Sequence, residues 1–302
     1  IGVAPLLENT EDKNSLVFDD EKKANLLQKQ FSSVYTKEAL DTIPQFEVRT
    51  HTKIGQVAIL ADLVNKKLKA LNTNKTYGPD EIHPKLLFEL ADIISEPVAI
   101  LLNSSIRSGR IPKEWKLANV VPVFKKGSKT IPGNYRPISL TCVLCRIMES
   151  FLKDTIMDHL LQNNLLSTRQ HGFISGRSTV TQLLSYLDSC ILNITNGDVV
   201  DVVYLDFQKA FDTVPHARLM KKLQAYGIDG EILLWITEYL KERSQVVIVN
   251  GESSASSDVI SGIPQGTVLG PLLFVIYIND ILDNYNISTI IKYTKSTNRF
   301  ND

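Results

Sequence analysis

The segment VVDVVYLDFQKAFDTVPH, residues 199–216, carries the strongest indication of the fold. Its residues 202–205 form an unbroken apolar run, which is typical of a central strand buried on both faces of a sheet. Asp206 follows directly, and a carboxylate at the end of so apolar a strand must be solvated, paired or bound to a cation. A strand-end aspartate that faces water is the alternative. The segment therefore predicts a buried strand over residues 199–207, with acidic chemistry possible at its end.

Apolar periodicity predicts helices on both sides of this segment, and valine-rich runs predict strands. Helices are expected at residues 21–35, 85–107, 148–165, 181–194 and 231–241, and Pro97 should break or kink the second of them into two packed pieces. Strands are expected at residues 118–124, 245–249 and 254–260, the last two joined by an Asn250-Gly251 turn. We expect the helices at 148–165 and 181–194 to cover a face of the sheet. Helices and strands do not alternate strictly, so the predicted fold class is α+β with an antiparallel contribution.

Composition excludes several classes of protein. The chain has 302 residues, 43% hydrophobic and 22% charged, which suits one large or two modest globular domains and not a collagen-like, mucin-like or disordered chain. The longest apolar run, residues 268–278, is interrupted by Gly270 and Pro271 and is shorter than the roughly 20 residues that a membrane span needs. We therefore expect no membrane association.

Cysteine usage points to a reducing, intracellular environment, because the chain has only three cysteines. Cys142 and Cys145 form a C-x-x-C, yet no second Cys or His pair lies nearby to complete a zinc site. We interpret them as two thiols that face the core.

Charge is balanced overall and concentrated locally. Lys plus Arg and Asp plus Glu each number 33, so no global field attracts nucleic acid. Residues 104–153, however, contain ten Lys and Arg side chains against two Glu side chains, a net charge of +8. Such a stretch favours contact with a phosphate backbone. A solvated charged surface is the alternative interpretation.

Two motifs of the chain are DFQKAFDTVPH at residues 206–216 and GIPQGTVLGPLLF at residues 262–274. They resemble motifs of the reverse transcriptases encoded by non-LTR (LINE-type, jockey-like) retrotransposons. Further matches occur in the same order as in the family, so the resemblance extends over about residues 5–285: Gly78-Pro79-Asp80, Trp115, Val121–Gly127, Asn134–Leu140, His171-Gly172-Phe173 and Asn279-Asp280.

The resemblance implies a right-hand polymerase with fingers and palm. Residues 1–60 would be a lead-in segment, residues 61–195 the fingers, and residues 196–302 a palm with a small antiparallel sheet; a thumb would be absent. The implied activity is RNA-directed DNA synthesis, with an RNA template, a DNA primer and deoxynucleoside triphosphates as partners. The implied cofactor is a pair of Mg²⁺ ions, which prefer carboxylate oxygens.

The resemblance also assigns roles to individual residues. Asp206 would hold both metal ions, and Lys125 and Arg136 would contact the incoming triphosphate. Phe211 would lie beneath the sugar and exclude a ribose 2′-hydroxyl, and Gln265 would contact the nucleotide or the template. The alternatives are solubilising charges at Lys125 and Arg136, a core phenylalanine and an ordinary turn residue.

The third catalytic motif of the family, an aromatic and a small residue followed by two aspartates, is missing. In its register this chain has Tyr293-Thr294-Lys295-Ser296, so an ammonium and a hydroxyl replace both acids. Ile174 also stands where the family has an arginine. We therefore expect a decayed or truncated, catalytically inactive copy. The alternatives are a non-catalytic protein that binds RNA or DNA through the basic fingers, and a translated relic without function.

Overall fold

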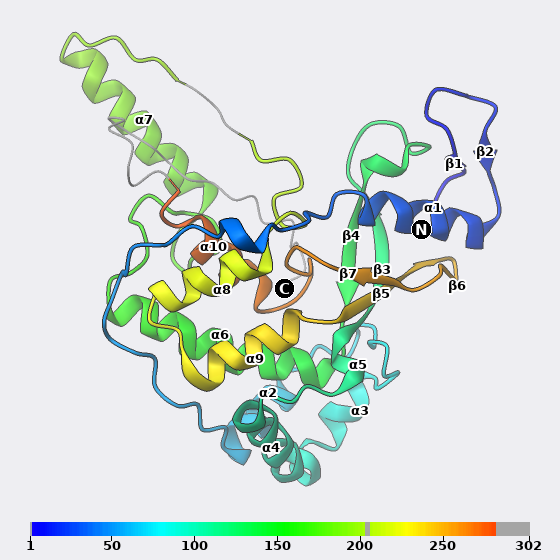
Figure 1. The fold of residues 1–302 in the computed structure, drawn as a ribbon, viewed down its shortest axis with the longest axis horizontal. Helices are drawn as coiled ribbons and strands as arrows, with labels where there is room; N and C mark the ends of the chain where they lie inside the picture. Colours follow the sequence, from blue (N-terminus) through cyan, green and yellow to red (C-terminus); the bar gives the residue numbers. More distant parts are fainter. Residues whose placement is uncertain (1, 203–205, 282–302) are drawn as a thin grey trace.

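The computed structural model describes residues 2–202 and 206–281, which form a mixed sheet and a cluster of helices beside it (Figure 1). The predicted α+β class is confirmed. The sheet lies on one side of the molecule and most of the helices on the other, with α7 projecting away from both (Figure 1). None of the helices in these ranges is both long and apolar enough to cross a membrane.

The sheet is built from β3 (Leu117–Phe124), β4 (Tyr135–Leu140) and β5 (Arg243–Val249), with β6 (Glu252–Ser253) and β7 (Ser257–Val259) paired to β5. The pairs β3–β4, β5–β6 and β5–β7 are antiparallel, whereas β3–β5 is parallel. The predicted turn at Asn250-Gly251 is confirmed: both residues have positive φ angles, 52° and 97°, as a tight two-residue hairpin turn requires.

Helix α1 (Asp20–Ser32) packs beside this sheet. Ala24, Leu27 and Phe31, the predicted apolar face, are buried together with Val120 and Val247 of the strands. The short strands β1 (Leu6–Leu7) and β2 (Leu16–Val17) precede α1, and η1 (Leu40–Thr42) follows it. A second short helix, η2 (Pro132–Asn134), leads into β4.

The main core lies among the remaining helices: α2 (Ala61–Lys69), α3 (Pro84–Glu89), α4 (Ala91–Ser108), α5 (Lys113–Lys116), α6 (Val143–Gln162), α8 (His216–Ala225), α9 (Gly230–Leu240) and α10 (Gly270–Ile278). Trp235 and Tyr239 stack at its centre with ring centroids 5.0 Å apart. Cys142 and Cys145 are fully buried, as predicted, and burial raises the pKa of the Cys142 thiol to about 12.

The predicted break at Pro97 is wrong. The two helical pieces separate at Leu90, and Pro97 lies inside α4. The missing N–H of a proline removes one hydrogen bond of the helix, and burial of Ala91, Val98 and Leu102 on one face keeps the helix continuous across that defect.

The predicted buried strand at residues 199–207 is also wrong for the part that the structure describes. Val199, Val202 and Phe207 are 90%, 43% and 58% exposed, and residues 199–202 and 206–207 belong to no strand. A buried strand needs hydrogen-bonding neighbours for its backbone, and no described segment pairs with these residues.

Helix α7 (Thr179–Thr195) covers no sheet face, against the prediction, and none of its residues is buried. The predicted range, residues 181–194, lies within the observed helix. Helix α6, expected at residues 148–165, covers no sheet face either: its buried residues, Met148, Leu152 and Ile156 among them, pack within the main core of helices.

Candidate functional site

Four cations lie near one another at the end of β3. Lys125 follows β3 directly, and Arg136 lies on β4 opposite Val123. The pKa of Lys125 is lowered by partial desolvation and then by the positive charges of Arg136, Lys126 and Lys209, while the Asp206 carboxylate raises it. The structure therefore brings three predicted site residues, Lys125, Arg136 and Asp206, into one electrostatic neighbourhood. We call Lys125, Lys126, Arg136 and Lys209 the basic cluster.

The loop that carries Gln265 is hydrogen-bonded both to β4 of this hairpin and to the turn that follows Asp206. The backbone N–H of Ser139 on β4 donates to the carbonyl oxygen of Gln265 at 2.7 Å. The side-chain amide of Gln265 donates to the Asp212 carboxylate at 2.8 Å. Burial raises the pKa of Asp212, although the hydrogen bond from Gln265 and the charge of Lys209 oppose this. Gln265 is thus held between the two chain segments expected to contact a nucleotide.

Phe211 lies at the junction of this site and the main core. Its ring stacks on Phe274 with centroids 4.3 Å apart and meets Phe173 edge-on at 6.0 Å. The N–H of Ile263 donates to its carbonyl oxygen at 2.8 Å, which fixes the Phe211 backbone to the Gln265 loop. The side chain is half-buried and packs against the main core.

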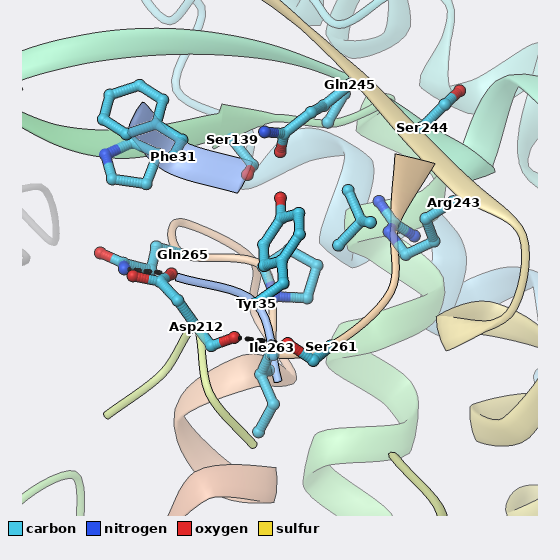
Figure 2. Close-up of a pocket in the computed structure, with 15 residues that line it drawn as sticks. Phe31, Tyr35, Ser139, Asp212, Arg243, Ser244, Gln245, Ser261, Ile263 and Gln265 are labelled. Atoms are coloured by element: carbon cyan, nitrogen blue, oxygen red, sulfur yellow. Dashed lines mark hydrogen bonds between the residues drawn. The ribbon is translucent and has the colours of Figure 1, made fainter. Parts of the chain in front are cut away.

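A pocket of about 30 Å³ lies beneath Gln265, enough room for one or two water molecules (Figure 2). Figure 2 shows the ring of Tyr35 among the lining residues of this pocket, between the Asp212–Gln265 pair and Arg243. Burial, and next the charge of Asp212, raise the pKa of the Tyr35 hydroxyl, which therefore stays neutral. Sequence reasoning did not select Tyr35, because it lies far from both motifs along the chain.

A fully buried acid supports the other end of the Gln265 loop. Glu149 of α6 accepts hydrogen bonds from the backbone N–H groups of Val268 and Leu269 at 2.8 and 2.9 Å, and from the Tyr239 hydroxyl at 3.1 Å. Desolvation raises its pKa, while these donors and the nearby Arg243 oppose the rise. One sequence signal points to Glu149: it is an acid within the apolar face of α6.

Contacts within the fold engage Asn279 and Asp280, the two residues that continue the second motif. The Asn279 side chain donates to the carbonyl oxygen of Leu165 at 2.8 Å and to the Tyr226 hydroxyl at 2.9 Å. The Asp280 carboxylate pairs with the buried ammonium of Lys222. The residues of the third motif, Tyr293, Thr294, Lys295 and Ser296, lie outside the described residues.

Comparison with known proteins identifies the family of the chain. Residues 123–297, more than half of the chain, match the family model "Reverse transcriptase (RNA-dependent DNA polymerase)". The chain belongs to the reverse transcriptase family. The predicted family is therefore confirmed, and the matched region contains Lys125, Arg136, Asp206, Phe211 and Gln265.

The relatives of this reverse transcriptase domain are proteins of mobile elements. It is 26% identical, over 91% of its length, to a probable RNA-directed DNA polymerase from transposon BS of Drosophila melanogaster. It is 28% identical, over 74% of its length, to the RNA-directed DNA polymerase from mobile element jockey of the same species. A Pol polyprotein from the retrotransposable element R2 of Popillia japonica is 28% identical over 58% of this chain. The chain spans 24 to 30% of the length of these three relatives.

Reverse transcriptases generally use divalent metal ions, and the described residues do not fit such a site. Among residues 2–202 and 206–281, no three His, Cys, Asp or Glu side chains lie close enough together to hold a metal ion. Asp206 is exposed beside the basic cluster, and Asp212 is engaged by Gln265. Cations next to a lone carboxylate oppose the binding of a divalent ion.

Proposed function

We propose that this reverse transcriptase domain binds an RNA template, a DNA primer and a deoxynucleoside triphosphate without catalysing nucleotide addition. The observation that carries the proposal is the basic cluster, which lies beside the chain segments that bear Phe211 and Gln265. Residues 61–195 would act as fingers and residues 196–302 as a palm, with residues 1–60 leading into them.

The chemistry of the basic cluster suits phosphate. Arg136 offers a planar fork of donors, and Lys125, Lys126 and Lys209 offer point charges, so together they complement a triphosphate or a nucleic-acid backbone. Desolvation and then the repulsion from Arg136, Lys126 and Lys209 lower the pKa of Lys125, and an anion that enters the cluster relieves that repulsion. Lys116, another base of the stretch 104–153, is engaged within the fold, since its ammonium lies 3.7 Å from the Glu238 carboxylate.

We expect no catalysis because the chain lacks the acidic side chains that would hold two metal ions. Two ions need several carboxylate oxygens, and Asp206 is the one acid that the family resemblance leaves to this chain. Lys295 and Ser296 occupy the register of the two missing aspartates. We therefore expect the chain to bind nucleic acid and nucleotide without catalysing nucleotide addition.

Binding is tested by fluorescence anisotropy with a labelled RNA–DNA duplex at several salt concentrations. We expect affinity to fall as a power of the salt concentration, and simultaneous replacement of Lys125, Lys126 and Arg136 by Ala to reduce the slope by about 2–3. Replacement of the exposed Lys13, Lys22 and Lys29 by Ala removes the same charge elsewhere and is the matched control. Salt-independent binding, or equal effects of the two triple variants, would contradict the proposal.

Catalysis is tested by primer extension on an RNA template with Mg²⁺ or Mn²⁺. We expect no extension. Nucleotide incorporation that disappears in Asp206→Asn would show that the chain is an active polymerase.

A further inference from the structure

Thr36 connects the two loops of the candidate site to each other. Its backbone N–H donates to the Ser261 hydroxyl at 2.8 Å, and that hydroxyl donates in turn to the carbonyl oxygen of Asp212 at 2.8 Å. The Thr36 hydroxyl donates to the carbonyl oxygen of Thr213 at 3.0 Å. One residue of the segment after α1 therefore contacts both the turn behind Phe211 and the loop that carries Gln265.

Glu38 holds the next element in place. Helix α8 has no side-chain cap from its own N-cap residue, Pro215. The Glu38 carboxylate accepts instead from the N–H groups of Ala217 and Arg218, at 2.9 and 3.1 Å. Its side chain is only 11% exposed. A carboxylate at this position satisfies two of the unpaired N–H groups of a helix start and interacts favourably with the helix dipole. Glu38 thereby fixes the point at which the turn after Phe211 ends.

Through Tyr35, Thr36 and Glu38, the segment of residues 35–38 contacts both loops and the start of α8. We propose that residues 35–38 act as a brace that sets the positions of Phe211 and Gln265, and that Thr36 and Glu38 are positioning residues for nucleotide binding. The brace lies outside residues 123–297, the part of the chain that matches the family model. Its effect on ligands rests on the proposed function, because it acts through the nucleotide-contacting residues.

A purely stabilising role for residues 35–38 makes a different prediction. Loss of these contacts would then lower the melting temperature and speed amide hydrogen exchange throughout the core, without changing the affinity of the folded protein. A brace acts locally: its loss speeds exchange at the two loops before it affects α6.

The first test is amide hydrogen exchange in Thr36→Val and Glu38→Gln, with Glu47→Gln as control. Glu47 belongs to the same segment, but its side chain is 78% exposed. The reporters are the N–H groups of Gly262 and Ile263, which donate to the carbonyl oxygens of Val214 and Phe211. We expect both variants to speed exchange there by about tenfold, with α6 unchanged. Thr36→Ser keeps the hydroxyl and should restore the wild-type rate.

The second test is the affinity for deoxythymidine triphosphate, measured by calorimetry well below the melting temperature. We expect Thr36→Val and Glu38→Gln to weaken binding by about tenfold and Glu47→Gln to leave it unchanged. If the wild type binds and both variants bind equally well, the brace is wrong while the proposed function stands. If the wild type does not bind, the proposed function fails, and hydrogen exchange alone decides: local acceleration supports the brace, and unchanged rates overturn it.

Discussion

The carboxylate of Glu149 accepts a hydrogen bond from the backbone N–H of Val268 at 2.8 Å, across 119 residues of sequence. This contact ties α6, in the middle of the main core, to the start of α10 and to the end of the loop that presents Gln265. The same carboxylate accepts from Leu269 and Tyr239, so one buried acid serves three elements of the fold. The Gln265 loop is consequently anchored at both ends, by Glu149 behind it and by Ser139 beside it.

Replacement of Glu149 by Leu should destabilise the protein strongly. The change leaves two buried backbone N–H groups and the Tyr239 hydroxyl without their acceptor, and we expect a loss of about 3–5 kcal/mol in the free energy of unfolding. Glu149→Gln keeps an acceptor oxygen and should cost less. Urea denaturation of the two variants measures the difference, and equal stability would show that the hydrogen bonds contribute little.

Local patterns predicted the helices well, because helical periodicity is carried by residues near one another in the chain. Helix α9 was expected at residues 231–241 and lies at Gly230–Leu240, and the apolar face of α1 is the predicted one. The predicted strand at residues 199–207 is wrong for residues 199–202 and 206–207, because a strand depends on partners that its own residues do not specify. Apolar character alone therefore predicted burial wrongly, both for the described part of this segment and for α7.

The candidate site, like the fold, was predictable from the sequence only in part. The motif resemblance selected Lys125, Arg136 and Asp206, and the structure places their charges near one another. It did not select Tyr35, Thr36 or Glu38, whose contacts span up to 225 residues and leave no local pattern. Whether Phe211 and Gln265 contact a nucleotide stays a prediction.

His216 should make the stability of the protein depend on pH. Its Nε2–H donates to the carbonyl oxygen of Gly262 at 2.7 Å, and burial lowers its pKa from the ordinary 6.5. The unfolded chain therefore takes up a proton at a higher pH than the folded protein does. The contribution of His216 is complete above pH 6.5 and is lost as the pH falls through the interval down to the lowered pKa.

Melting temperatures measured from about pH 8 to about pH 5 test this dependence. We expect His216→Gln to flatten the acid side of the profile, because glutamine does not titrate. His51 is exposed, so His51→Gln should leave the profile of the wild type intact. A profile that changes equally in both variants would contradict the role of His216.

Gly262 should tolerate no side chain, because a Cβ atom there would lie 2.6 Å from the carbonyl oxygen of Asp212. Its φ angle of 85° is also unfavourable for other residues. Gly251 is the matched control, since its φ angle is 97° but nothing lies within 4 Å of an added Cβ. We expect Gly251→Ala to cost about 1–2 kcal/mol from backbone strain alone, and Gly262→Ala at least about 3 kcal/mol. Urea denaturation compares the two; equal losses would mean that Asp212 and Gly262 separate easily.

Restoring the missing acids should restore metal affinity. An ammonium near a divalent ion is repelled where a carboxylate is attracted, and two unit charges 4 Å apart interact by about 4 kcal/mol at an effective dielectric constant of 20. Because each 1.36 kcal/mol is about tenfold, the combined change Lys295→Asp and Ser296→Asp should strengthen Mg²⁺ binding by about a thousandfold. Calorimetry with Mg²⁺ measures this, with Lys292→Asp as a control that adds a nearby acid outside the motif register. If both variants bind Mg²⁺ alike, general charge explains the gain and the register assigned to the third motif is wrong; if neither gains affinity, Asp206 is not the partner of the restored acids.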